Sequence, residues 1–143
     1  MNLFQPTDAE YESRIRASFL RQQVMQLLGA SLRRIEPGAV SISLPYREDL
    51  TQQNGYLHAG VITTIADSAC GYAAYTLMPA GSGVLSVEFK VNLLRPAEGE
   101  EFNAEAQVVK AGKTLTVTRC DVYAQAADKT ALIATMLATM IRR

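Results

Sequence analysis

The chain has 143 residues, its 14 Lys and Arg balance its 14 Asp and Glu, and 48% of its residues are hydrophobic. This length fits a single domain over residues 1–143 that can bury a core without metal or disulfide support. The balanced charge excludes a net field that would attract nucleic acid or an anionic membrane, so we expect neither as a partner. A small molecule or a second copy of the chain is the expected partner.

The first predicted element is an amphipathic helix over about residues 7–28. Thr7 and Glu10 have the spacing of a capping box, which marks a helix start. Apolar residues then recur at roughly helical spacing until Gly29, a residue type that commonly ends helices. These apolar residues are Tyr11, Ile15, Phe19, Val24, Leu27 and Leu28.

A strand hairpin and a loop follow this helix. Residues 30–35 and 39–44 flank a Glu-Pro-Gly turn signal, and the second segment alternates apolar residues with serines. Residues 45–57 contain several turn-prone sequences that break the periodicity, so we predict a loop there.

Residues 59–78 are predicted to form a long central helix. They are small or apolar almost without interruption, and Pro79 follows them. A helix that is apolar on nearly every face must be covered all round. The structure around it must therefore supply a wrapping layer.

The remaining chain is predicted to form strands. Residues 102–109 and 115–124 surround a turn, and residues 130–141 are assigned as a strand because they continue a meander. The clearest strand is 85–93, where apolar residues alternate with polar ones, namely Ser86, Glu88, Lys90 and Asn92. Several strands around one apolar helix predict an α+β fold in which an antiparallel sheet wraps the helix.

The single carboxylate of the central helix, Asp67, is the first candidate for chemistry. An unpaired charge is costly to bury, and a function is a common compensation. The alternative is a core carboxylate that is satisfied by Thr63, Thr64 or the backbone. Sequence alone leaves both possibilities open.

The start of that helix is the second candidate. His58, Ala59 and Gly60 stand where free backbone N–H groups and a partial positive charge could hold an oxyanion. The alternative is simply a compact helix start. Because Asp67 follows Ala59 by eight residues, the two are separated by about 12 Å along one helix. They can act on one carbonyl only in a twofold dimer with antiparallel helices.

Three further polar residues are weaker candidates. Gln52 could hold a water or a carbonyl, and Ser86 could bond to water or to Asp67, although each could also be an ordinary exposed residue. Arg95 could bind phosphates or decorate a solvated surface. The same two possibilities apply to three other basic residues, namely Lys110, Lys113 and Arg119.

Two cysteines and the N-terminus suggest where the protein works. Cys70 and Cys120 lack the close spacing of a metal site or redox pair, so we expect buried free thiols and no metal. The first residues do not resemble a secretion signal, and no apolar stretch reaches ~18 residues without a charge. We therefore expect a cytoplasmic protein.

Several of these residues together carry a family resemblance. The segment Gln52-x-x-Gly55-x-x-His58-Ala59-Gly60, with Asp67 nine positions after the histidine, is followed by Gly83-Val-Leu-Ser86-Val-Glu-Phe89 and Leu94-Arg-Pro-Ala97. This pattern resembles the hotdog-fold acyl-CoA thioesterases of the PaaI and 4-hydroxybenzoyl-CoA thioesterase type. It covers roughly residue 44 to the C-terminus, so the first helix lies outside it.

The resemblance implies a hotdog fold, to which the predicted N-terminal helix is an extra element, and hydrolysis of an acyl- or aryl-CoA thioester without a cofactor. It implies a dimer or tetramer in which the Ala59 N–H binds the thioester oxygen while Asp67 of the partner subunit attacks it or activates water. His58 would orient the site, and Gln52 and Ser86 would position water or the carboxylate. Substrate binding is assigned to the remaining site residues, Gly60, Asn54, Arg95 and Ser68.

Two departures from the family pattern stand out. The usual His-Gly-Gly is His-Ala-Gly here, which adds a methyl group at Ala59, and Gln52 stands where many members have Asn. Two other functions stay open: a non-catalytic acyl-thioester-binding dimer, and an enoyl-thioester hydratase with a histidine base. Aromatic and apolar residues that could line an acyl groove are Tyr46, Tyr72, Met78 and Phe89.

Overall fold

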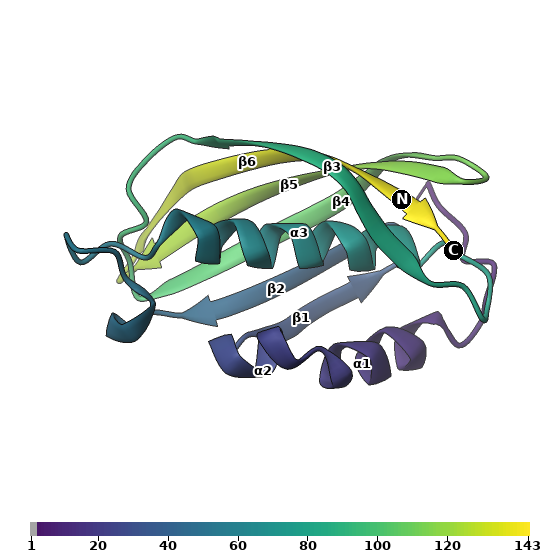
Figure 1. Ribbon diagram of the computed structural model, residues 1–143, viewed down its shortest axis with the longest axis horizontal. Coiled ribbons are helices and arrows are strands. Elements are labelled where there is room, and N and C mark those ends of the chain that lie inside the picture. The colour runs from purple at the N-terminus through teal and green to yellow at the C-terminus, as the bar shows by residue number, and fades with distance from the viewer. Residues whose placement is uncertain (1–2) are drawn as a thin grey trace.

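A six-stranded sheet wraps one long helix in the computed structural model, which describes residues 3–143. The strand order is β1-β2-β4-β5-β6-β3, and all neighbours are antiparallel. Figure 1 shows α3 (Ala59–Tyr75) lying against the inner side of this sheet. The strands are β1 (Ser31–Glu36), β2 (Ala39–Pro45), β3 (Val84–Leu93), β4 (Glu101–Ala111), β5 (Leu115–Ala126) and β6 (Lys129–Arg142). The expected α+β architecture is confirmed.

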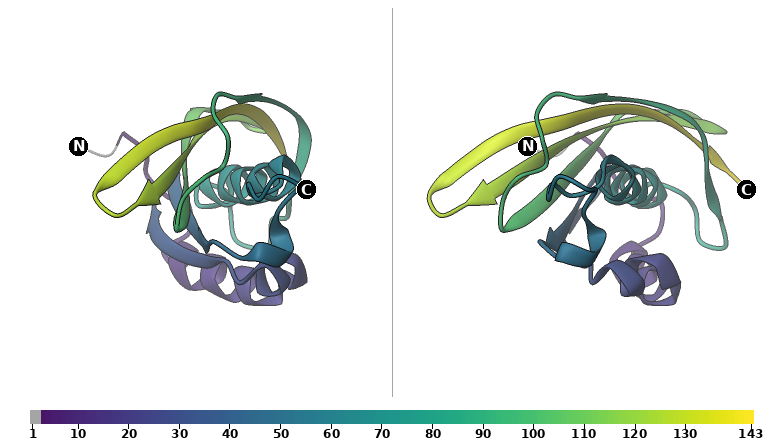
Figure 2. Two further views of the ribbon diagram at one scale, coloured as in Figure 1. Left: turned by 90° about the vertical axis from the view of Figure 1, so that its left-hand side faces the viewer. Right: turned by 60° about the vertical axis from the view of Figure 1, so that its left-hand side comes forward.

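The sheet arches over α3, while two N-terminal helices lie below it (Figure 2). These are α1 (Tyr11–Arg21) and α2 (Gln23–Leu28). The prediction of one helix over 7–28 was wrong, because Gln22 has an extended backbone with φ −80° and ψ 96° and separates the two. The side chain of this break residue turns toward α3, where it is hydrogen-bonded.

The predicted capping box is also absent. The Thr7 hydroxyl donates to the carbonyl of Leu77 instead of capping the local helix. The carboxylate of Asp8 accepts from the N–H of Glu10, and α1 begins only at Tyr11. A long-range partner for Thr7 has therefore displaced the local motif.

Helix α3 ends three residues earlier than predicted, at Tyr75. The Thr76 hydroxyl donates to the Ala73 carbonyl at 2.7 Å and accepts from the Gly38 N–H at the same distance. The following N–H groups bond three residues back, which tightens the chain into turns before Pro79. Contact with the β1–β2 turn thus fixes the helix end.

One side of α3 is not covered by this chain. The buried side packs chiefly on β4, β2 and β5, but a stripe of small and polar residues is only half-buried or exposed. The spacing of three and four residues places them on one face. This stripe consists of Gly60, Thr63, Thr64, Asp67, Ser68 and Gly71. The expectation of a helix covered all round was wrong for a single chain.

Strand β3 is an edge strand that carries a bulge at Val87. Ser86 pairs with Met140 and Glu88 with Thr139, so one extra residue interrupts the alternation. Ser86 was predicted on the polar side with Glu88, but the bulge turns it to the inner side, toward α3. Apolar side chains of this strand remain substantially exposed, including Leu85, Val87, Phe89 and Leu93.

Both cysteines are buried free thiols, as predicted. Cys70 on α3 and Cys120 on β5 lie side by side, and the hydrogen bond with Cys70, together with burial, raises the pKa of Cys120 well above its ordinary value. Among residues 3–143, no helix is long and apolar enough to cross a membrane.

Candidate active site

Asp67 lies half-buried on the uncovered side of α3, where the inward-turned Ser86 reaches it. The Ser86 hydroxyl donates to Asp67 Oδ1 at 2.6 Å and also contacts the sulfur of Met140. Thr63 and Thr64 do not satisfy the carboxylate, since their hydroxyls bond to the carbonyls of Ala59 and Gly60. The carboxylate is therefore held from the edge strand and faces a pocket.

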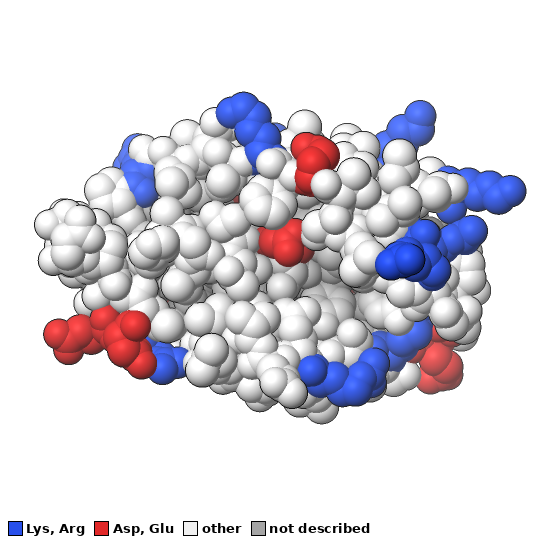
Figure 3. All heavy atoms as spheres, viewed as in Figure 1, with Lys and Arg blue, Asp and Glu red and all other residues white. Residues whose placement is uncertain are grey.

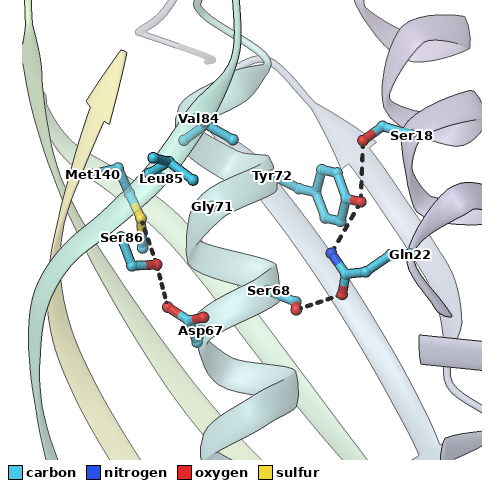
Figure 4. A pocket seen from close by; sticks show the side chains of 10 residues that line it. All are labelled: Ser18, Gln22, Asp67, Ser68, Gly71, Tyr72, Val84, Leu85, Ser86 and Met140. Carbon is cyan, nitrogen blue, oxygen red and sulfur yellow. Dashed lines mark hydrogen bonds between the residues drawn. The ribbon is translucent and has the colours of Figure 1, made fainter. Parts of the chain in front are cut away.

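This first pocket has a volume of about 280 Å³ and lies between α3, β3 and the N-terminal helices (Figure 4). Asp67 and Ser86 stand on one side of it, and Tyr72 stands on the other. The remaining lining residues are Ser18, Gln22, Ser68, Gly71, Val84, Leu85 and Met140. The pocket thus joins a carboxylate to a mixed polar and apolar cavity.

A hydrogen-bond chain runs along the wall of this pocket away from Asp67. Ser68 donates to Gln22 Oε1 at 2.9 Å, and Gln22 Nε2 donates to the Tyr72 hydroxyl at 3.3 Å. Ser18 and the Tyr72 hydroxyl are also 3.3 Å apart. Burial raises the pKa of Tyr72, although the hydrogen bonds of Ser18 and Gln22 lower it. The Tyr72 hydroxyl therefore keeps its proton near neutral pH.

Ser18 and Gln22 were missed by the sequence analysis. Both were assigned to an amphipathic helix with no role in the site, and only the helix break at Gln22 brings its side chain inward. Of the four candidate groove residues, Tyr72 lines this pocket. The other three, Tyr46, Met78 and Phe89, do not line it.

His58 caps the start of α3. Its Nδ1 accepts the N–H of Gly60 at 2.8 Å, so in the neutral ring Nε2 carries the proton. A Cβ on Gly60 would stand 3.0 Å from Nδ1, which explains the glycine next to this ring. The His58 ring therefore occupies the space beside the Gly60 Cα.

The N–H of Ala59 is left free by this arrangement. Within residues 3–143 it has no hydrogen-bond acceptor, whereas the next N–H is taken by His58. Ala59 lines a second pocket, of about 480 Å³, together with Gln52 and Arg95. Its apolar lining includes Leu57, Ile62, Leu93, Leu94 and Ile133. The residue with this free donor therefore lines a largely apolar cavity.

The loop before α3 is folded back on itself. Gln52 Oε1 accepts the N–H of Asn54, and the carbonyl of Gln52 accepts the N–H of Gly55. Asn54 is exposed at the tip of this turn and lines neither pocket. Gln52 reaches the second pocket from this turn, and its side-chain amide nitrogen remains available as a donor.

The structure thus separates the predicted site residues into two groups. Asp67, Ser68 and Ser86 gather at the first pocket, and Gln52, Ala59 and Arg95 gather at the second. The other basic candidates are not part of either group: Arg119 pairs with Asp121, and neither Lys110 nor Lys113 lines a pocket named here. Figure 3 shows most charged side chains toward the rim of this face.

Comparison with known proteins gives the family. Residues 54–131 match the thioesterase superfamily. A crystal structure of a thioesterase family protein from Silicibacter pomeroyi is 52% identical over 92% of this chain and 97% of that one, with a TM-score of 0.91. Acyl-coenzyme A thioesterase 13 of Homo sapiens is 33% identical over 65% of this chain and 66% of its own length. The chain belongs to the thioesterase superfamily.

Membership of this superfamily makes the protein a thioester hydrolase. The fold is similar to that of the E. coli PaaI protein, with a TM-score of 0.84 at 18% identity over 94% of each chain. The predicted hotdog fold and family resemblance are confirmed.

The match to the thioesterase superfamily begins at residue 54 and therefore includes His58, Ala59, Asp67, Ser86 and Arg95. The residues that precede it include Ser18 and Gln22, which the structure brings to the Asp67 pocket. The wall formed by α1 and α2 therefore lies outside the matched region.

Proposed function

We propose that this thioesterase hydrolyses an acyl- or aryl-CoA thioester to the free acid and CoA, at two equivalent sites shared between the subunits of a homodimer. The observation that carries the proposal is the separation of the two halves of one active site. Asp67 lines the first pocket near the middle of α3, and Ala59, whose N–H is free, lines the second pocket at the start of the same helix.

The uncovered stripe of α3 supports the dimer. Small side chains such as Gly60 and Thr63 allow two helices to approach closely, and a twofold axis midway between Ala59 and Asp67 falls at Thr63. The exposed apolar edge strand β3 borders the same side of α3 and provides further surface to bury. In such a dimer, Ala59 of one subunit faces Asp67 of the partner subunit.

The proposed reaction has two steps in its general-base form. Asp67 takes a proton from water while the hydroxyl oxygen adds to the thioester carbon, and the Ala59 N–H of the other subunit stabilises the oxyanion. The intermediate then collapses, the carbon–sulfur bond breaks, and the CoA thiolate takes the proton from Asp67. In the alternative form, Asp67 itself attacks the thioester carbon, and the carbon–sulfur bond breaks to release the CoA thiolate. Water then hydrolyses the resulting mixed anhydride to the free acid and the Asp67 carboxylate, and the proton released neutralises the thiolate.

The remaining residues have supporting roles in this proposal. Ser86 orients the carboxylate through the hydrogen bond to Oδ1. His58 and Gly60 fix the start of α3 so that the Ala59 N–H points into the pocket, and Gln52 offers its amide nitrogen to water or the thioester oxygen. Arg95 and Asn54 stand near the second pocket, where they could meet the CoA phosphates and backbone. Ser68 contributes to acyl binding.

The test is thiol release from a panel of acyl- and aryl-CoAs. We expect Asp67→Asn to lower kcat by at least about 100-fold while the fold and oligomeric state are kept. Asp128→Asn, at the exposed β5–β6 turn, is the matched control and should stay within twofold of wild type. Full activity of Asp67→Asn would overturn the proposal.

The same assays address the two other functions. Binding of acyl-CoA without thiol release from any substrate would favour the non-catalytic binding dimer. Addition of water to a crotonyl thioester without thiol release would favour the hydratase. The cytoplasmic location and the possibility of a tetramer stay predictions, which fractionation and light scattering would test.

A further inference from the structure

We propose that the pocket beside Asp67 holds the acyl group, and that its polar far wall selects acyl groups of limited length carrying a hydroxyl or similar hydrogen-bonding group at their far end. This inference rests on the proposed thioesterase function and specifies its substrate class. The wall is built by residues of α1 and the α1–α2 break together with α3.

The far wall is a connected set of hydrogen-bonding groups. The hydrogen bonds join Ser68 to Gln22 at 2.9 Å and Gln22 to the Tyr72 hydroxyl at 3.3 Å. The Tyr72 hydroxyl in turn lies 3.3 Å from that of Ser18. Tyr72 is only 4% exposed, so its hydroxyl is held within the protein beside the cavity. Figure 4 shows this chain of contacts opposite the Asp67 and Ser86 pair. An acyl group that starts at Asp67 would therefore end against polar atoms.

The wall has unused hydrogen-bonding capacity of both kinds. Gln22 Nε2 donates to Tyr72 with one hydrogen and keeps a second one, and the Ser68 oxygen keeps acceptor lone pairs while it donates to Gln22. In the hydrogen bond between Ser18 and Tyr72, one hydroxyl is the donor, so the hydrogen of the other hydroxyl is still available for a ligand. A hydroxyl group on the substrate can both donate and accept here. A methyl group would instead exclude water and leave the unused donors and acceptors of the wall without hydrogen-bond partners.

The size of the pocket limits the acyl group. Asp67 and Tyr72 are five residues apart on α3, which corresponds to ~7.5 Å along the helix axis. Roughly six bonds of an extended chain cover this distance, because a carbon–carbon bond of about 1.5 Å advances a zigzag chain by only about 1.25 Å. The volume of about 280 Å³ lies at the low end for small-molecule pockets. A long unbranched acyl chain would meet the wall before it was fully accommodated.

Gly71 provides an independent indication that the pocket is kept open. It lies inside α3 with ordinary helical backbone, and a Cβ at this position would meet no atom within 4 Å. Glycine is less favourable than alanine inside a helix, so neither backbone geometry nor packing in this chain explains it. A twofold axis at Thr63 places Gly71 beyond the start of the partner's α3. Within this chain, the space beside Gly71 is therefore open to an acyl group.

The decisive experiment uses two acyl-CoAs of the same shape, 6-hydroxyhexanoyl-CoA and heptanoyl-CoA. The quantity measured is the ratio of their kcat/KM values, in which differences in enzyme amount and stability cancel. We expect the wild-type ratio to be at least 1 and Gln22→Leu to lower it roughly tenfold, because a hydrogen-bonding wall becomes apolar. The matched control, Gln26→Leu on the exposed side of α2, should keep the wild-type ratio within twofold.

A second variant tests the pocket without touching the polar wall. Gly71→Ala should lower the heptanoyl-to-acetyl ratio of kcat/KM roughly tenfold by filling the cavity, with unchanged oligomeric state. An unchanged ratio in both Gln22→Leu and Gly71→Ala would overturn the acyl-pocket inference while leaving the thioesterase intact. Failure of the proposed function would look different, since wild type would then release no thiol from any acyl-CoA.

Discussion

The Ser86 hydroxyl on edge strand β3 donates a 2.6 Å hydrogen bond to Asp67 Oδ1 on α3. The bulge at Val87 makes this contact possible, because without the extra residue Ser86 would share the outer side with Glu88. This hydrogen bond fixes the side-chain conformation of Asp67 relative to strand β3. Ser86 is therefore expected to position Asp67 rather than react.

Ser86→Ala should lower kcat about 3- to 30-fold and change KM little, because Asp67 stays but loses its orienting donor. Ser86→Thr, which keeps the hydroxyl, should recover much of the loss. Steady-state kinetics of both variants, with Ser31→Ala on exposed β1 as control, make the comparison. Equal kcat values for wild type and Ser86→Ala would remove the positioning role.

A subunit-mixing experiment tests the shared site directly. Ala59→Pro removes the free N–H at the first position of α3, where proline is well tolerated, and the extended backbone of His58 suits a residue before proline. Ala59→Pro and Asp67→Asn should each be nearly inactive. After co-refolding in equal amounts, about one quarter of wild-type activity should return, because half of the dimers are mixed and each has one intact site.

The separate, unmixed variants assayed at the same total concentration serve as the control for mixing. No recovery in demonstrably mixed dimers would mean that each active site is built within one subunit. Mass spectrometry of differently tagged chains would verify that mixed dimers had formed.

Arg14 on α1 is expected to stabilise the end of α3. Its side chain is 16% exposed, bonds Asp8 at 2.9 Å and donates to the carbonyls of Met78 at 2.8 Å and Tyr75 at 3.3 Å. The guanidinium also lies 4.3 Å from the centre of the Tyr75 ring. Arg14→Leu should lower the free energy of unfolding by about 1–3 kcal/mol, measured by urea denaturation.

The matched variant for this measurement is Arg16→Leu on the same helix. Arg16 is 55% exposed and pairs with Glu12 one turn away, so its loss should cost no more than about 0.5 kcal/mol. Similar costs for the two arginine variants would show that Arg14 does not hold the end of α3.

The raised pKa of Cys120 predicts a loss of stability at high pH. The hydrogen bond with Cys70 and burial keep the folded thiol protonated, while the unfolded thiol ionises above about pH 8.5. The folded state then binds more protons, so stability falls as pH rises through this range. Between pH 8 and pH 10 we expect about 1–2 kcal/mol of loss from this group.

The comparison for this effect is Cys120→Ala, whose free energy of unfolding should change less between pH 8 and pH 10 than that of wild type. The lower absolute stability of this variant does not affect the comparison, because only the change in the free energy of unfolding with pH is compared. Tyr72, whose pKa is also raised by burial, contributes less in this range, because its unfolded form is half ionised only at about pH 10, and its contribution is the same in both proteins. Parallel slopes for the two proteins would exclude Cys120 as the cause.

Much of the fold and part of the site were predictable from the sequence. The alternation in residues 85–93 and the continuous apolar run after Ala59 are local patterns, and local periodicity reflects which faces are buried. His58, Ala59 and Asp67 could be singled out because residue types and spacing along one helix fix their separation, and their roles in catalysis stay predictions. The eight-residue spacing is also the reason why the proposed site takes Ala59 and Asp67 from two subunits.

The tertiary structure decided what depends on contacts between distant segments. The helix break at Gln22 coincides with hydrogen bonds to Ser68 and Tyr72, which lie 46 and 50 residues away. The bulge at Val87 set the side to which Ser86 points, and a one-residue slip is invisible in a two-residue alternation. Periodicity tells which residues share a face, but only packed partners determine where a helix breaks or a strand gains a residue.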